Sequence, residues 1–85
     1  MVYSVSIPEA VHKELRSFPK TARARLLARA MTLSNDPRPS GVKKLHGYDS
    51  TYRVRVGNYR IIYEIDDHTQ QIAVLWIADR KDAYR

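Results

Sequence analysis

The first part of the chain changes from a two-residue period of apolar positions to a helical period. Residues 2–7 alternate, with aromatic and β-branched side chains on one parity, as in a strand with one buried face. Pro8 suits the first turn of a helix, where its missing N–H would go unused. Apolar side chains then recur at i, i+4 and i+7 from Val11, which predicts a helix over residues 8–18.

A second helix is predicted directly after the first, so that the two form a helical hairpin. Pro19 ends the first helix, and residues 20–34 resume the helical period with Arg25 and Arg29 on the outer face. We expect that outer face to be solvated rather than to bind a ligand. Residues 35–41 contain two prolines and a glycine, cannot continue a helix, and predict a structured connector.

After the connector the chain has the pattern of strands. Residues 42–47 predict a short strand or a loop, and residues 51–56 alternate between the two faces of a strand. Gly57 and Asn58 tolerate the positive φ that a tight two-residue hairpin turn demands. Residues 59–65 are therefore expected to be the return strand of a hairpin.

The apolar run at residues 72–78 predicts the last strand, after a polar turn at residues 66–70. Such a run is typical of a central strand buried on both faces. The elements together predict an α+β fold of order β-α-α-β-β-β. It comprises an N-terminal strand, a helical hairpin and a three-stranded antiparallel meander, in one twisted sheet with the helices on one face. Because the chain has 85 residues, we expect residues 1–85 to be a single domain.

The positive charge of the chain is concentrated in one region. Lys and Arg total 15 against 9 Asp and Glu, a formal charge of +6. Residues 1–60 hold 12 of the basic residues and 4 of the acidic ones, whereas residues 61–85 hold 3 and 5. Charge that served solubility alone could be spread anywhere, so this asymmetry favours a directed contact with an anionic partner.

The composition excludes several classes of function. There is no cysteine, which excludes a disulfide framework and thiolate catalysis and fits a reducing cytosol. No apolar run approaches the roughly 20 residues of a membrane helix, and no secretion signal is visible, so we expect a cytoplasmic protein without a membrane contact. The histidines lack metal-ligand spacing and the glycines form no phosphate loop, so no metal and no cofactor are expected.

The predicted hairpin gathers arginine on one side of the sheet. A two-residue turn pairs Arg55 with Arg60 and Arg53 with Ile62, so the three arginines share the face opposite the helices. Like charges directly opposite each other destabilise a sheet, and guanidinium groups match the oxygens of a phosphate. We therefore expect a bound anion there. The alternative is an exposed face whose arginines splay into water.

The C-terminal residues extend this hypothesis. If the last strand lies next to the hairpin, Arg80 and Tyr84 join the arginines. Tyr84 offers a ring that can stack on a base and a phenol that can donate a proton, as an RNA-cleaving site would require. Packing of Tyr84 against its own sheet is the alternative.

Three strings of the sequence resemble the RelE branch of the RelE/ParE toxin superfamily: DPRPSGVKKLHG at residues 36–47, YRVRVGNYRIIYEI at residues 52–65 and RKDAY at residues 80–84. The resemblance implies the toxin of a type II toxin–antitoxin pair, an endoribonuclease that cuts messenger RNA in the ribosomal A site. Its partners would be a RelB-like antitoxin and the messenger on the ribosome. A ribosome-independent ribonuclease, a ParE-like toxin that binds DNA gyrase, and an inactive nucleic-acid-binding module are the alternatives.

The resemblance also implies the residues of the site. The implied catalytic set is Arg53, Arg55, Arg60, Arg80 and Tyr84, and the implied RNA contacts are Lys43 and Lys44. The reaction would be metal-free attack of a ribose 2′-hydroxyl on the adjacent phosphate, with guanidinium groups stabilising the developing charge.

The base for this reaction is the open question at the level of sequence. Arg55 stands where some members of the family have lysine, and arginine does not readily release a proton. Asp79 stands where many members have histidine. The alternatives are proton transfer by Asp79, Lys81 or Tyr84, and catalysis by positioning of the RNA alone.

Overall fold

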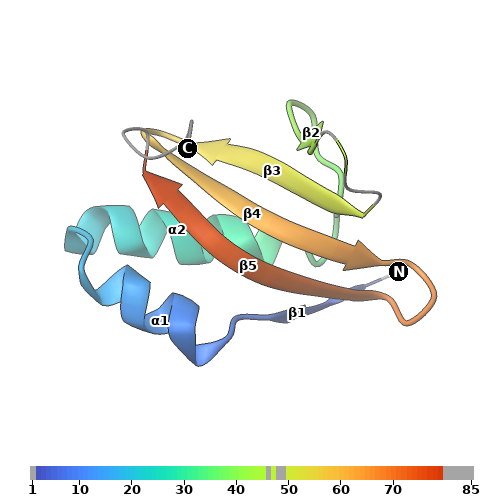
Figure 1. Cartoon of the computed structure of the whole chain (residues 1–85), viewed down its shortest axis with the longest axis horizontal. Coiled ribbons are helices and arrows are strands. Elements are labelled where there is room, and N and C mark those ends of the chain that lie inside the picture. Colours follow the sequence, from blue (N-terminus) through green and yellow to red (C-terminus); the bar gives the residue numbers. More distant parts are fainter. Residues whose placement is uncertain (1, 46, 48–49, 80–85) are drawn as a thin grey trace.

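Two helices cover one face of a five-stranded sheet (Figure 1). The computed structural model describes every residue except 1, 46, 48–49 and 80–85. In chain order its elements are β1 (Ser4–Ser6), α1 (Glu9–Arg16), α2 (Lys20–Thr32), β2 (Lys43–Lys44), β3 (Thr51–Val56), β4 (Tyr59–Asp66) and β5 (Gln71–Asp79). The predicted α+β fold is confirmed. Neither helix of the described chain has the length and apolar character needed to span a membrane.

The strands are arranged in the order β1-β5-β4-β3-β2. β1 runs parallel to β5, and the other neighbours are antiparallel. Parallel neighbours need a crossover connection, and the chain between β1 and β5 includes the helical hairpin that covers the sheet (Figure 1). β2 lies in the segment that the sequence left as strand or loop, so the sheet has one strand more than the four predicted.

Prolines precede both helices and set where they begin. Pro8 has φ −63° and ψ 158°, an extended conformation, so α1 begins at Glu9 rather than at the proline. The helix ends at Arg16, where a tighter turn follows, two residues before the predicted end. Pro19 has the same extended form ahead of α2, which ends at Thr32 rather than at residue 34.

The helices and one face of the sheet share a single hydrophobic core. The side chains that enter it from the helical layer, with Leu33 directly after α2, are buried almost completely: Val11, Leu15, Leu26, Ala30 and Leu33. The sheet meets them with Val54, Ile61, Tyr63, Ile65, Ile72, Val74 and Ile77. Each buried aliphatic side chain contributes roughly 1.5–3 kcal/mol to folding, and this core fixes which face of every strand is turned away from the helices.

The hairpin of β3 and β4 has the register that its turn predicts. Arg55 pairs with Arg60, and Arg53 pairs with Ile62. Gly57 in the turn has φ 59°, a left-handed conformation that glycine adopts without the clash of a side chain. The prediction of the hairpin, including its facing arginines, is confirmed.

β5 differs from the predicted strand buried on both faces. Ile62 pairs with Trp76 and Tyr63 pairs with Val74, so Leu75 is an extra residue that forms a β-bulge. Leu75 is 39% exposed and Trp76 is 47% exposed. The prediction was wrong here because the helices cover only one face of the sheet and the bulge turns Trp76 toward the other.

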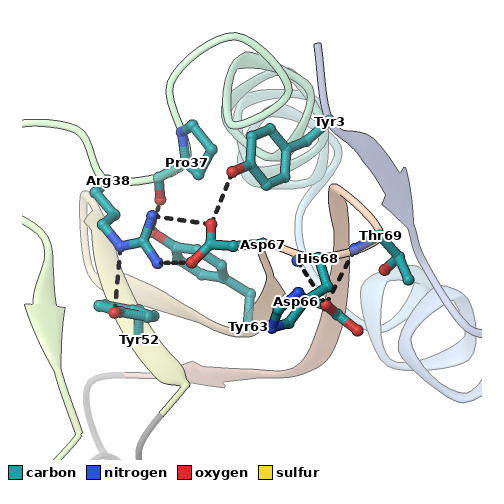
Figure 2. A network of polar contacts seen from close by, with 9 residues as sticks. All are labelled: Tyr3, Pro37, Arg38, Tyr52, Tyr63, Asp66, Asp67, His68 and Thr69. Carbon is teal, nitrogen blue, oxygen red and sulfur yellow. Dashed lines mark hydrogen bonds and ion pairs between the residues drawn. The ribbon is translucent and has the colours of Figure 1, made fainter. Parts of the chain in front are cut away.

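Arg38 ties the connector to the turn between β4 and β5 (Figure 2). Its Nη2 donates to Asp67 Oδ2 at 2.9 Å, and its Nε donates to the Tyr52 hydroxyl at 3.2 Å. The Tyr3 hydroxyl donates to Asp67 Oδ1 at 2.7 Å, which brings the N-terminal segment into the same network. These contacts hold residues 35–41 beside the sheet, and the hydrophobic pattern contained no sign of them.

The carboxylates of this turn are stabilised in their charged form. The hydrogen bond from Arg38 lowers the pKa of Asp67, and the one from Tyr3 adds to the effect. The same bond to Asp67 raises the pKa of the Tyr3 phenol. Asp66 accepts a hydrogen bond at 3.2 Å from the backbone N–H of Thr69, which lowers its pKa as well.

Tyr63 anchors the connector from the core side. Its side chain is buried, and its hydroxyl donates to the carbonyl oxygen of Pro37 at 2.7 Å (Figure 2). Burial raises the pKa of Tyr63 to about 12. The ring stacks on Tyr52 at a centroid distance of 6.1 Å, so the core is joined directly to the contacts of Arg38.

Candidate functional site

Four basic side chains line one cavity on the face of the sheet opposite the helices. Lys43 from β2, Arg53 and Arg55 from β3, and Arg60 from β4 enclose about 230 Å³ together with Gly41. Lys43 pairs with Arg53, and Arg55 pairs with Arg60. Because cross-strand partners share a face, the register of three strands brings these four side chains together. We refer to this site as the four-cation cavity.

The three arginines of the four-cation cavity differ in exposure. Arg55 is exposed and Arg53 is half-buried, whereas Arg60 is only 8% exposed. The sequence placed all three on an open face, so the burial of Arg60 is a correction. No buried side-chain nitrogen or oxygen of the described residues lacks a hydrogen-bond partner. Burial restricts the Arg60 side chain, and a side chain whose motion is already restricted loses less conformational freedom when an anion binds.

Arg25 of α2 extends the positive surface to the tip of the hairpin. A β-carbon on Gly57 would lie 3.5 Å from Arg25 Nη1, so the guanidinium covers the turn. A smaller hollow of about 130 Å³ beside the turn is lined in part by Arg55 and Arg60. The sequence predicted only solvation for Arg25, because helical periodicity does not reveal which loop the outer face of a helix meets.

Two further predicted site residues lie on the other side of the sheet. Lys44 pairs with Tyr52, which packs against the core, so Lys44 is on the face opposite to Lys43. Asp79 pairs with Tyr59, whose ring lies 4.9 Å from that of Phe18 in the helical layer. The register therefore does not place Lys44 or Asp79 among the lining of the four-cation cavity.

Three predicted site residues lie outside the described part of the chain: Arg80, Lys81 and Tyr84. β5 ends at Asp79, and Ala78 pairs with Arg60. The chain therefore leaves β5 next to the strand that carries Arg60, as the sequence analysis assumed.

Acidic side chains lie at the opposite end of the same sheet face. Glu64 and Asp66 of β4 line a separate hollow of about 380 Å³, together with Ser4 and Gln71. Arg60 is near the start of β4 and Asp66 is its last residue. The sheet face is thus polarised along β4, with cations at the hairpin and carboxylates at the far end, which directs an anionic ligand to the hairpin.

The four-cation cavity has the chemistry of a phosphate site. Guanidinium groups present planar, paired N–H donors that match phosphate oxygens, and lysine adds a compact charge. Arg53, Arg55 and Arg60 together can therefore stabilise the negative charge of an anion.

Comparison with known proteins agrees with this combination of fold and site. The model of a family described as the ParE toxin of the type II toxin–antitoxin system, parDE, matches residues 6–84. The chain belongs to this family of toxins, within the RelE/ParE superfamily. The resemblance that the sequence analysis drew from three strings is confirmed.

Individual relatives carry RelE-type names. A Methanocaldococcus jannaschii protein that bears the toxin name RelE1 is 31% identical over 88 residues, which cover 100% of this chain and 98% of that protein. The toxin RelG of Mycobacterium tuberculosis is 29% identical over 86 residues, with 100% and 99% covered. The archaeal RelE–RelB complex from Pyrococcus horikoshii contains a chain of similar structure, with a TM-score of 0.84, 35% identity, and 98% and 100% covered.

Proposed function

We propose that this RelE-like toxin is an endoribonuclease that cleaves messenger RNA in the ribosomal A site. The observation that carries the proposal is the four-cation cavity, in which Lys43, Arg53, Arg55 and Arg60 converge on about 230 Å³. Each messenger nucleotide carries one phosphate, and a cleaved phosphate gains negative charge in the transition state. Preorganised cations around that phosphate usually supply the largest single contribution to such a reaction.

The proposed reaction transfers the phosphorus from one oxygen to another. The ribose 2′-oxygen forms a bond to the adjacent phosphorus and loses its proton to a base. The bond from phosphorus to the 5′-oxygen of the next nucleotide breaks, and that oxygen takes up a proton. The products are a 2′,3′-cyclic phosphate and a free 5′-hydroxyl. The four-cation cavity would hold the non-bridging oxygens of the phosphate while these bonds change.

Proton transfer is assigned in this proposal to the C-terminal residues. Arg80 would assist the leaving oxygen, and Tyr84 would donate a proton or stack on a base. Lys81 is the further candidate for acid–base catalysis, whereas the register places Asp79 on the other side of the sheet. The support is the position of Ala78, which pairs with Arg60, so that the chain continues from a point beside the cavity.

The proposed partners are a RelB-like antitoxin and the translating ribosome. The support for the antitoxin is the Pyrococcus horikoshii structure, which is a RelE–RelB complex, together with the RelBE2 toxin–antitoxin complex of Mycobacterium tuberculosis, whose matching chain has a TM-score of 0.82 and 27% identity. An acidic antitoxin would be attracted by a chain of formal charge +6. Cleavage on ribosomes implies that the toxin acts in the cytoplasm.

Inhibition of DNA gyrase by protein binding is the second candidate function. The description of the matching family as ParE toxins favours it. In that case the basic face would bind a protein surface, and no RNA bond would break. Cleaved RNA is therefore a measurable product of the first candidate function and not of the second.

An in vitro translation assay with a defined messenger tests the proposal. Cuts are mapped by primer extension with and without ribosomes, for the natural chain, for Arg55→Ala and for the matched control Arg16→Ala. Arg55 and Arg16 are both exposed, but Arg16 lies on α1 and pairs with Glu9. We expect cuts only with ribosomes, reduced roughly 100-fold by Arg55→Ala and unchanged by Arg16→Ala.

The other outcomes of the same assay have distinct meanings. Equal cutting without ribosomes would identify a free ribonuclease and contradict dependence on the ribosome. The absence of any cut, combined with inhibition of gyrase supercoiling by the natural chain, would favour the second candidate.

A further inference from the structure

The β-bulge of β5 places an indole on the face that carries the four-cation cavity. Trp76 pairs with Ile62, which pairs with Arg53, and Arg53 pairs with Lys43. Four strands therefore contribute one row of side chains to this face. Trp76 is 47% exposed, whereas Ile62 between it and Arg53 is 4% exposed. The ring lies at the end of a row whose other end lines the cavity.

The bulge is the reason that Trp76 is on this face. Ile72 and Val74 point into the core, and Ile77 does so again after the extra residue Leu75. Simple alternation from Val74 would have turned Trp76 toward the helices. Bulges that re-aim a side chain are over-represented beside functional sites, and this one exposes an aromatic ring at a cost in buried apolar surface.

The distance from Trp76 to the cavity suits one nucleotide. Ile62 is the direct partner of Trp76, and Arg60 is two residues from Ile62 on the same face of β4. Such diagonal neighbours are roughly 7–8 Å apart. A phosphate held by Arg60 and Arg55 would leave the sugar and base of a neighbouring nucleotide within reach of the indole.

The charge pattern of this face identifies the kind of ligand. The cations lie at the hairpin end and the carboxylates Glu64 and Asp66 lie at the far end, so a polyanion is favoured only near the hairpin. Exposed aromatic rings beside a basic groove are the usual arrangement for single-stranded nucleic acid, because every base has a π face that can stack.

We propose that Trp76 stacks on a base of the single-stranded RNA whose phosphate occupies the four-cation cavity. The inference rests on the proposed function and adds a base-binding residue to it. Stacking is tolerant of sequence and favours purines only through their larger ring area. Trp76 therefore positions the RNA for cleavage, while Arg55 and Arg60 bind the phosphate.

Intrinsic fluorescence gives a direct test, because Trp76 is the only tryptophan of the chain. The natural chain is titrated with a short, single-stranded 2′-O-methyl oligoribonucleotide, which cannot be cut because it lacks the attacking hydroxyl. Binding is followed independently by the anisotropy of a dye on the oligonucleotide. We expect saturable quenching of Trp76 with the same midpoint as the anisotropy. Inorganic tripolyphosphate should displace the RNA without itself quenching the indole.

Three variants test the role of Trp76 in cleavage on the ribosome. Trp76→Phe keeps a ring that can stack, Trp76→Ala removes it, and Leu75→Ala truncates the exposed neighbour as a control. In single-turnover cleavage on ribosomes we expect Trp76→Ala to be slower by roughly 5- to 100-fold, with Trp76→Phe and Leu75→Ala close to the natural chain. Thermal unfolding confirms that each variant is folded, and the fluorescence titration of the natural chain decides the matter if the alanine variant is not.

Failure of the inference is distinguishable from failure of the proposed function. RNA that binds by anisotropy without quenching Trp76, or ribosomal cleavage that Trp76→Ala leaves unchanged, would overturn the stacking alone. Unchanged cleavage with weakened antitoxin binding would make Trp76 a protein contact instead. A natural chain that neither binds RNA nor cuts it on ribosomes would overturn both proposals.

Discussion

Arg55 and Arg60 face each other directly across the hairpin of β3 and β4, on the same side of the sheet. Like charges in this position oppose folding, yet both side chains line the four-cation cavity. The arrangement is expected where a site is built for an anionic ligand and the ligand relieves the repulsion. Arg55 is therefore expected to lower the stability of the fold while it helps to bind the anion.

Replacement of the exposed partner should make this separation measurable. We predict that Arg55→Ala raises the free energy of unfolding by about 0.2–1 kcal/mol, because it removes the repulsion of Arg60, while it lowers ribosomal cleavage. Urea denaturation at low salt measures the stability, and Arg55→Lys should leave it near that of the natural chain. A loss of stability on removal of Arg55 would show that its packing outweighs the repulsion.

The affinity for RNA should decrease as the salt concentration rises. Each phosphate neutralised on a single strand contributes about −0.7 to the slope of log K against log salt concentration. The single phosphate held in the four-cation cavity therefore predicts a contribution of about −0.7 to the slope for the uncleavable oligonucleotide, and Arg53→Ala should reduce the magnitude of the slope. Arg16→Ala is the control with the same change of charge. Equal slopes for both variants would place the RNA outside the cavity.

Low pH should break the contact between Arg38 of the connector and Asp67 in the turn after β4. Arg38 and Tyr3 lower the pKa of Asp67 in the folded state, so the contact stabilises the fold above the ordinary aspartate pKa of about 3.9. That stability is lost as the pH falls through the lower, folded pKa. We predict that Asp67→Asn lowers the melting temperature by a few degrees at pH 7 and makes no difference at pH 2.

The control for this prediction is Glu9→Gln, which breaks the exposed ion pair with Arg16. Exposed pairs of that kind contribute little, so its melting temperature should follow that of the natural chain at both pH values. A pH-independent effect of Asp67→Asn would mean that loss of hydrogen bonds, rather than loss of charge, is responsible.

High pH should break the hydrogen bond between the buried Tyr63 and the connector at Pro37. Tyr63 donates to the Pro37 carbonyl at 2.7 Å, and burial raises its pKa to about 12. Because the folded pKa exceeds the unfolded value of about 10, this contribution is complete below pH 10 and is lost as the pH rises toward 12.

We predict that Tyr63→Phe costs about 1 kcal/mol at pH 7 through the lost hydrogen bond and flattens the decline in stability between pH 10 and 12. Urea denaturation across this range measures both effects. Tyr52→Phe provides the comparison, because it removes a hydroxyl from the half-buried ring that stacks on Tyr63 and leaves the Tyr63 phenol in place. The same alkaline decline in Tyr63→Phe as in the natural chain would assign it to another group.

Local patterns were sufficient for the elements near the site. A turn of two residues determines the register of the strands that it joins, so the pairing of Arg55 with Arg60 followed from Gly57 and Asn58 alone. The parity of a strand then placed Arg53 with them. Turn length and strand parity depend only on neighbours along the chain, and the observed pairs agree with both.

Contacts between distant segments do not follow from such local patterns. The link from Arg38 to Asp67 joins residues 29 positions apart, and the link from Tyr3 to Asp67 spans 64 positions. Arg25 covers Gly57 only because α2 packs across the hairpin end of the sheet. No periodicity along the chain records which loop meets which helix.

The sequence by itself determined the α+β class, the hairpin register and the three arginines of one face, because periodicity and turn geometry are local properties. Only the tertiary structure decided that Arg60 is buried, that Lys43 joins the cavity while Lys44 does not, and that Trp76 is exposed. The physical reason is that burial depends on what covers a residue. A single bulge at Leu75 changes the face of every residue that follows it in β5, and nothing in an unbroken apolar run marks the position of that bulge.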